Sequence, residues 1–244
     1  MAQVQVAVHP AEVNPAKLPG KRVVMFDVLR ASSTIVTALA AGARGIVPVV
    51  EVDEARAKAK ACGPGTLLGG ERGAKRIPGF DLGNSPLEYV GQVVRDRIIV
   101  MTTTNGTKAL ARGAGAREIL VGCLLNAPSL ADYLAASPGG DILLICAGVQ
   151  GRIALEDILG AGCLVSLLER RGMEIEGDGA FLAAQVYFMY RDDLAAAMGT
   201  FEHGRRLLEL GFGEDIAYCA QKGPLAVLPR LEGGIIRVGD GHVW

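Results

Sequence analysis

Residues 22–36 read RVVMFDVLRASSTIV and place an apolar run, a polar turn and a helix start next to one another. Val23–Phe26 is short, apolar and partly branched, which is typical of a strand buried in a sheet. Asp27 ends that run, and three consecutive hydroxyl side chains suit the N-cap of a helix over Ile35–Ala43. The segment therefore predicts that a carboxylate and an arginine, Arg30, project at the carboxyl end of a strand.

Open α/β sheets bind their ligands at this edge, and helix N-termini attract anions. A second interpretation is equally consistent with these residues alone. In it, Asp27 only begins a loop and Arg30 is a solvated surface cation.

Apolar runs alternate with helical segments along most of the chain, which predicts an α/β fold with a mostly parallel sheet and right-handed crossovers. The expected strands are residues 3–8, 23–26, 45–50, 66–68, 97–101, 118–121 and 141–145, and the expected helices are residues 35–43, 52–62, 108–113, 127–136 and 153–171. Residues 177–221 are expected to form a helical C-terminal part in two or three pieces. A final hairpin is expected between Ile235–Val238 and His242–Trp244. No linker divides the sequence, so residues 1–244 are expected to form a single domain.

The composition excludes several classes of protein. Half of the 244 residues are hydrophobic but only 5% are aromatic, so aliphatic side chains must fill the core, as they do around buried parallel strands. The formal charge of −1 gives no sign of a nucleic-acid surface, and the apolar runs are too short to span a membrane. There is no signal-peptide pattern, and the five cysteines are never spaced CxxC, which predicts reduced thiols in the cytoplasm.

Five polar segments follow predicted strands or begin helices. They are residues 27–33, residues 71–84 of a long irregular connection, TTTNGT at 102–107, CAGVQGRIALED at 146–157, and GRR at 204–206 with Glu214-Asp215. The hydroxyls, the Asn and the Gly of TTTNGT suit a phosphate or a carboxylate. Taken singly, these residues are better explained as an ordinary Asn-Gly turn after a Thr-rich strand end. GRR and Glu214-Asp215 are likewise better explained as a charged helix surface.

Glu156 and Asp157 lie early in a helix whose other residues are nearly all apolar or small. The helix macrodipole favours one carboxylate there, so one needs no further explanation. Two adjacent carboxylates are harder to place on a solvated face. A divalent metal would account for them, because hard cations take oxygen ligands.

Cys146 and Arg152 have the CX5R spacing of the phosphate loop in cysteine-dependent phosphatases. In that loop a thiolate attacks phosphorus and the arginine holds the phosphate oxygens. A buried structural cysteine at a strand end is the more common situation.

Taken together, these segments resemble one known family. DVLRASSTIVTALAAGA, GERGAKRIPGFDLGNSP, TTTNGT, CAGVQGRIALEDILGAG and GRRLLELGFGEDI follow one another over residues 27–216 and are similar to 2-phosphosulfolactate phosphatase, an enzyme of coenzyme M biosynthesis, and its bacterial relatives. The resemblance implies a three-layer α/β/α fold. It also implies Mg²⁺-dependent hydrolysis of the phosphate monoester of 3-sulfolactate to sulfolactate and phosphate.

The resemblance further implies that residues from distant segments meet at one edge of the sheet. The expected catalytic residues are Asp27, Arg30, Cys146 and Glu156; the expected substrate-binding residues are Ser32, Ser33, Arg72, Asn84, Thr104, Asn105, Gly106, Thr107 and Arg152; the expected metal ligands are Asp27, Glu71, Glu156 and Asp157. Arginines are needed because the phosphate, carboxylate and sulfonate groups of the substrate carry about four negative charges together. Asp27 and the Glu156–Asp157 pair are expected to share one Mg²⁺ ion.

Three routes to the P–O bond stay open: metal-activated water, a phospho-enzyme at Asp27, and attack by Cys146. The number of acidic residues favours a metal-dependent route. Alternative functions are a phosphatase for another small phosphorylated hydroxy acid and an anion-binding protein without turnover. The expected partner is a small anionic phosphate ester, with no nucleic acid and no membrane. A homodimer is compatible with the sequence.

Overall fold

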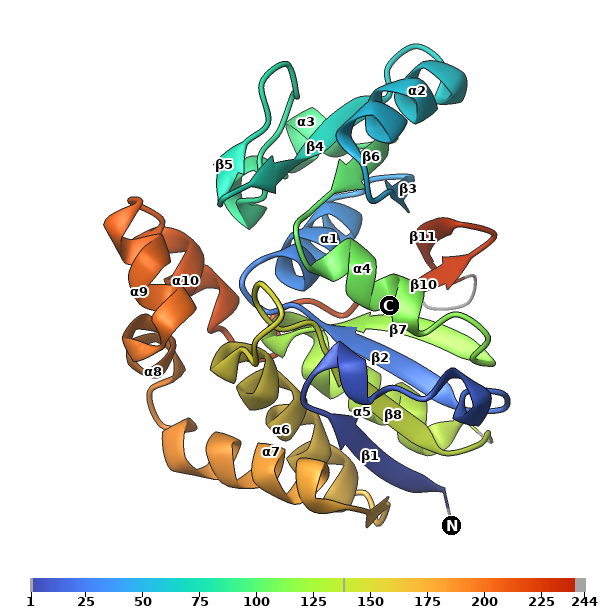
Figure 1. Ribbon diagram of the computed structural model, residues 1–244, viewed down its shortest axis with the longest axis vertical. Helices are drawn as coiled ribbons and strands as arrows, with labels where there is room; N and C mark the ends of the chain where they lie inside the picture. Colours follow the sequence, from blue (N-terminus) through green and yellow to red (C-terminus); the bar gives the residue numbers. More distant parts are fainter. Residues whose placement is uncertain (1, 138, 240–244) are drawn as a thin grey trace.

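The computed structural model describes residues 2–137 and 139–239 and has an α/β architecture (Figure 1). The strands of the described residues form one sheet in the order β5-β4-β6-β3-β11-β10-β7-β2-β8-β1-β9. Their bounds are β1 Gln3–Ala7, β2 Arg22–Phe26, β3 Gly45–Pro48, β4 Leu67–Arg72, β5 Lys75–Arg76, β6 Ile98–Thr102, β7 Glu118–Gly122, β8 Ile142–Cys146, β9 Glu174–Ile175, β10 Pro229–Glu232 and β11 Ile235–Val238. The helices are α1 Ala31–Ala40, α2 Val52–Cys62, α3 Gly91–Val94, α4 Gly106–Arg112, α5 Ala127–Ala136, α6 Leu155–Glu169, α7 Asp178–Tyr190, α8 Leu194–Thr200, α9 Glu202–Glu209 and α10 Gly213–Cys219.

The sheet is mostly parallel, as the alternation of strands and helices predicts. One parallel block contains β4, β6 and β3, and the other contains β7, β2, β8, β1 and β9. The antiparallel hairpin β10–β11 lies between the blocks, and it pairs with β7 and with β3 through single residue pairs. The sequence alternation alone did not indicate this insertion.

Strand β2 shows why the sheet is covered on both faces. Val23 and Met25 pack in a cluster with the apolar residues of α1 and α4, whereas Val24 and Phe26 pack in a second cluster with those of α5 and α6. Successive side chains of a strand point to opposite faces, so a strand buried on both faces reads as a continuous apolar run. The result is the three-layer α/β/α arrangement that the resemblance implies.

Helix α1 begins at Ala31, earlier than the predicted start at Ile35. The three hydroxyl residues are buried in its first turns instead of capping it. Ser32 Oγ accepts a hydrogen bond from the backbone N–H of Asp27 at 2.8 Å, and Ser33 Oγ donates to the carbonyl of Val28 at 2.8 Å. These bonds fold the turn after β2 back on the helix, so the hydroxyls satisfy the turn rather than the helix end.

The C-terminal part is helical, as predicted, but it consists of the four helices α7 to α10. Strand β11 forms a hairpin with β10, which the sequence did not predict. Gly233 and Gly234 connect these strands and both have positive φ, at 56° and 81°. Two such residues fit the tight turn that matches the twist of a hairpin. The predicted partner His242–Trp244 lies outside the described residues.

In the part of the chain that the structure describes, no helix has the length and apolar character needed to cross a membrane.

Candidate active site

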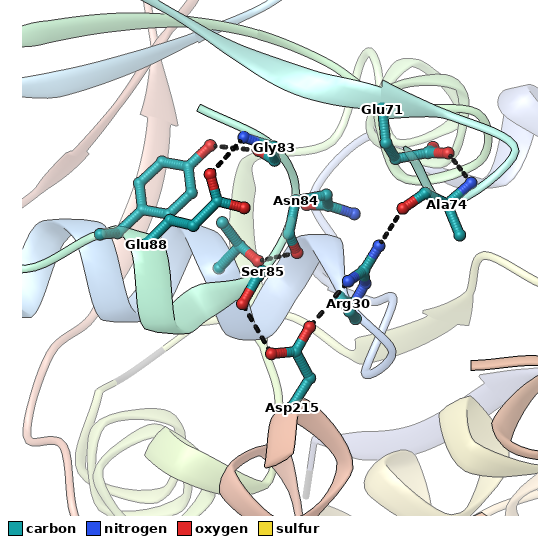
Figure 2. A network of polar contacts seen from close by, with 10 residues as sticks. Arg30, Glu71, Ala74, Gly83, Asn84, Ser85, Glu88 and Asp215 are labelled. Atoms are coloured by element: carbon teal, nitrogen blue, oxygen red, sulfur yellow. Dashed lines mark hydrogen bonds and ion pairs between the residues drawn. The ribbon is translucent and has the colours of Figure 1, made fainter. Parts of the chain in front are cut away.

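A small polar cavity of about 60 Å³ lies where segments following β2, β4, β6 and β8 meet residues of α9. It is lined by Asp27, Leu29, Arg30, Glu71, Gly73, Ala74, Asn84, Thr103, Thr104, Asn105, Val149, Gln150, His203 and Arg206. The structure therefore brings together predicted residues from three distant segments. Part of this surrounding network is shown in Figure 2.

Asp27 follows the buried strand β2 and is itself buried. Its Oδ1 accepts a hydrogen bond from the backbone N–H of Ala31 at 3.2 Å. Burial raises the pKa of Asp27 to about 6; among its charged neighbours His203 opposes the rise, while Glu71 and Glu156 add to it. A Cβ atom at Gly106 would lie 2.8 Å from Oδ2 of Asp27, so glycine at this position lets α4 approach the carboxylate.

Glu71 organises the opposite wall of the cavity. Its Oε1 accepts hydrogen bonds from both the backbone N–H and the hydroxyl of Thr104, each at 2.8 Å. Its Oε2 accepts a bond from the backbone N–H of Ala74 at 2.8 Å. Glu71 thus ties the end of β4 to the loop after β6.

The TTTNGT segment contributes Thr103, Thr104 and Asn105 to the cavity wall. Asn105 Oδ1 accepts a hydrogen bond at 3.2 Å from the backbone N–H of Gln150, in the loop after β8. Thr107 is buried and its hydroxyl donates to the carbonyl of Thr103 at 3.1 Å. The segment is therefore a connector between two cavity walls as well as a turn.

His203 and Arg206 line the cavity from α9 and are the residues that the sequence interpretation missed. His203 Nδ1 lies 2.8 Å from Oε1 of the buried Glu156. The available signal was their spacing: His203 and Arg206 stand three residues apart, on one helix face. The GRR motif drew attention to this region, but a charged helix surface looked the better explanation.

Glu156 and Asp157 are both buried at the start of α6, but they have separate tasks. Asp157 Oδ1 accepts from the backbone N–H of Val28 at 2.7 Å, and Oδ2 accepts from that of Gly148 at 3.0 Å. Burial, with Asp27 and Glu156 nearby, raises the pKa of Asp157 well above its usual value. Asp157 therefore fastens the loop after β8 to the segment after β2.

Several predicted site residues are not brought to the cavity. Ser32 and Ser33 are fully buried and do not line it. Arg72 donates to the carbonyls of Glu71 and Val50 and to the Thr102 hydroxyl. Arg152 is exposed, and it forms an ion pair with Glu202 at 2.7 Å.

Cys146 is also not among the residues that line the cavity. It is completely buried at the end of β8, and burial, with the nearby Asp157, raises the pKa of its thiol. A phosphate loop needs a thiolate and an arginine around one anion. Cys146 and Arg152 do not have this arrangement.

A larger hollow of about 470 Å³ adjoins the small cavity. The two share Val149, Gln150, His203 and Arg206, which form their boundary. The rest of the hollow is lined by Arg152, Ile153, Ala154, Leu155, Glu156, Phe201, Glu202 and Glu209. It thus combines apolar surface with charges of both signs.

The oxygen atoms around Asp27 suit a hard cation. Asp27 and Glu71 both line the cavity, and Asn84 Oδ1 is buried without a hydrogen-bond partner. Among the described residues, no three His, Cys, Asp or Glu side chains are grouped closely enough to hold a metal ion by themselves. Mg²⁺ does not require such a group, because it keeps several waters and is bound through one or two carboxylates together with phosphate oxygens.

Fold and site together define an α/β protein with a small cavity at its strand ends that is lined by two carboxylates, two arginines and a histidine. Residues 7–234 match the family described as 2-phosphosulpholactate phosphatase. A protein of Caldanaerobacter subterraneus subsp. tengcongensis named probable 2-phosphosulfolactate phosphatase is 42% identical over 232 residues, which cover 93% of this chain and 95% of that protein. A Clostridium acetobutylicum protein of the same name is 33% identical over 234 residues, which cover 96% and 99% of the two chains. The chain belongs to the 2-phosphosulfolactate phosphatase family, as the sequence motifs indicate, and is a phosphoric monoester hydrolase.

Proposed function

We propose that this enzyme hydrolyses 2-phosphosulfolactate to 3-sulfolactate and phosphate with the help of Mg²⁺, as in coenzyme M biosynthesis. One observation carries the proposal. A small cavity that combines Arg30 and Arg206 with the buried Asp27 opens beside a larger hollow. This arrangement supports a substrate with a phosphoryl group at one end and a further charged part at the other.

The two volumes support an orientation for the substrate. The space of about 60 Å³ is the smaller of the two, and it is the one that Arg30 and Asp27 line, so it suits the phosphoryl group. The carboxylate and the sulfonate therefore extend into the hollow of about 470 Å³. Arg206 lines both spaces, so it can bind an oxygen on either side of the ester bond.

Asp27, Glu71 and the Asn84 side-chain oxygen are the residues that would hold Mg²⁺. The ion would supply charge stabilisation for the phosphoryl oxygens in the transition state. Glu156 and Asp157 are not among the residues that line this small cavity. The proposed set of ligands is accordingly narrower than the set that the family resemblance implies.

The side chains of the cavity have separate parts in the reaction. Water adds to phosphorus and passes one of its protons to a phosphoryl oxygen while the bond from phosphorus to the ester oxygen breaks. The ester oxygen takes a proton from a general acid and leaves as a hydroxyl group. The Glu156 contact occupies Nδ1 of His203, so Nε2 is the atom that can deliver this proton. Arg30 and Arg206 line the cavity and bind the phosphoryl oxygens, and fixed donors of this kind stabilise charge as it develops.

A phosphate-release assay tests the proposal. The purified protein is given 2-phosphosulfolactate and a panel of other phosphorylated hydroxy acids, each with Mg²⁺ and with EDTA. We expect the sulfonated ester to have the highest kcat/KM, and we expect EDTA to abolish turnover until Mg²⁺ is restored. A preference for an ester without a sulfonate would assign a different substrate. Binding of esters without any release of phosphate would leave an anion-binding protein.

A further inference from the structure

Asp215, on α10, belongs to a buried network beside the cavity without lining the cavity itself (Figure 2). Its side chain is one of the few acidic groups that the fold buries, although its neighbour Glu214 is exposed. Asp215 Oδ2 accepts a hydrogen bond from Nη1 of Arg30 at 2.7 Å, and Oδ1 accepts from the Ser85 hydroxyl at 2.6 Å. Both carboxylate oxygens are therefore committed to defined partners.

The guanidinium group of Arg30 is held on three sides. Asp215 binds one nitrogen, and the carbonyl of Ala74 accepts from Nη2 at 2.8 Å. The Phe212 ring, also near the start of α10, lies under the group at 4.1 Å from its central carbon. A planar, always charged guanidinium fixed in this way presents its remaining donors in one orientation. Arg30 is among the residues that line the cavity.

Stability alone is a poor explanation for this arrangement. Taking two charges out of water carries a desolvation cost that can exceed their attraction, so an apolar pair of similar volume is often as stable. A buried Arg–Asp pair beside an anion site is better explained by what it does to the arginine. Asp215 fixes where the positive charge stands, and it leaves Arg30 facing the cavity.

The same network reaches the other wall of the cavity. The carbonyl of Ala74 binds Arg30, and the N–H of Ala74 binds Glu71, which in turn holds Thr104. Ser85 adjoins Asn84, a further cavity residue. A shift of Arg30 would therefore be transmitted to the loop after β6 as well as to the bound phosphoryl group.

We propose that Asp215 is a positioning residue, which holds the Arg30 guanidinium in the orientation that binds the phosphoryl oxygens. Asp215 thereby couples the C-terminal helices to catalysis. The inference rests on the proposed function, in which Arg30 binds the phosphoryl group. Asp215 itself touches no reacting atom in this scheme. It acts through Arg30, and its removal should change substrate handling more than it changes the fold.

The first experiment compares Asp215→Asn with Glu214→Gln, which removes the same charge from the exposed neighbouring position. Asp215→Asn keeps the side-chain volume and loses the charged acceptor. We expect it to lower kcat/KM on the best ester by about 100-fold, because a misplacement of about 1 Å at a reacting group costs about that much. Glu214→Gln should match the wild type. Equal kinetics for Asp215→Asn and wild type would overturn the inference.

The second experiment is a double-mutant cycle with Arg30→Met. If Asp215 acts through Arg30, Asp215→Asn should have no further effect on kcat/KM once Arg30 is gone, whereas independent roles give additive losses. Arg30→Met alone leaves a buried carboxylate unpaired, but the double variant removes both charges and is the form expected to stay folded. Additive losses, with Asp215→Asn and the double variant folded by circular dichroism, would overturn the inference.

Inorganic phosphate gives a readout that does not depend on turnover. Saturating phosphate should raise the thermal midpoint of the wild type and of Glu214→Gln by mass action. It should raise the midpoint of Asp215→Asn far less, since Arg30 is no longer fixed. If no ester is hydrolysed but phosphate still distinguishes these variants, the proposed function fails and the positioning role stands. An equal rise in all three proteins would overturn the positioning role.

Discussion

The imidazole Nδ1 of His203 lies 2.8 Å from the Oε1 atom of Glu156, and this contact joins α9 to the first turn of α6. Glu156 is buried, while His203 lines both the small cavity and the larger hollow. A carboxylate at Nδ1 sets the orientation of an imidazole and leaves the other nitrogen free for a substrate. The contact therefore makes His203 the residue best placed to protonate the leaving oxygen.

His203→Ala should lower kcat on the alkyl ester by roughly 10²- to 10⁴-fold, which is the usual range for loss of a general acid. Glu156→Gln should act in the same direction but less strongly, because the imidazole remains and only its orientation is weakened. Steady-state kinetics on the best hydroxy-acid ester measure both effects.

An ester with a good leaving group provides the control for this prediction. p-Nitrophenolate departs without a proton, so His203→Ala should reduce its release from p-nitrophenyl phosphate much less. Equal losses on both esters would show that His203 binds the substrate rather than protonating the leaving group.

Cys146→Ala should retain wild-type kcat and KM. The side chain is fully buried and its thiol has a raised pKa, so it supplies no thiolate to the cavity. The substitution removes one sulfur atom from the core, so the free energy of unfolding should fall by about 1 kcal/mol or somewhat more. Kinetics and thermal melts of the variant test both statements. A loss of activity out of proportion to the fall in midpoint would restore the cysteine mechanism.

Much of the fold follows from local patterns in the sequence. The apolar run of β2 and the position of Asp27 at its end are determined by side-chain polarity over a few residues, and the structure confirms both. The hairpin β10–β11 was not found, because insertion between two parallel blocks depends on which strand edges remain free. Strand edges are a property of the assembled sheet and leave no periodic signal in a segment.

The candidate site was predictable only where the polar residues follow strands. Arg30, Glu71, Thr104 and Asn105 line one cavity because strand ends gather, but it was the family resemblance that selected these residues over their structural alternatives. Asp215 was interpreted as part of a charged helix surface, yet the fold buries it against Arg30, 185 residues away. A charge on a short helix looks the same in sequence whether its partner is water or a distant guanidinium.

Asn105→Ala should reduce turnover strongly and leave the thermal midpoint nearly unchanged. Its side chain lines the cavity and accepts one hydrogen bond, from the backbone N–H of Gln150 on the exposed loop. An exposed bond of this kind contributes about 1 kcal/mol or less to stability. Thermal melts and phosphate-release kinetics on the same preparation check the prediction. A large fall in midpoint with normal kinetics would make Asn105 a structural connector only.

Asp27→Asn should make the metal-free protein more stable at neutral pH, although it should reduce activity by orders of magnitude. Burial raises the folded-state pKa of Asp27 from 3.8 to about 6, so the folded protein holds this proton more tightly than the unfolded chain does. The charged form is therefore unfavourable in the fold. Its cost is absent below about pH 4, develops as pH rises from 3.8 towards 6, and is complete above 6.

Asparagine cannot ionise, and its side-chain oxygen can still accept the bond from the Ala31 N–H. Relative to wild type in EDTA, Asp27→Asn should therefore gain up to roughly 3 kcal/mol above pH 6, and the gain should vanish near pH 4. Mg²⁺ should raise the thermal midpoint of the wild type but not that of the variant.

Asp157→Asn is the matched control variant. Both carboxylate oxygens of Asp157 accept hydrogen bonds from backbone N–H groups. Asparagine has only one side-chain oxygen, so one of these bonds would be lost and the gain in stability should be smaller or reversed. Denaturant melts from pH 4 to pH 8 measure these differences, and a pH-independent difference between Asp27→Asn and wild type would contradict a carboxyl group that titrates near pH 6.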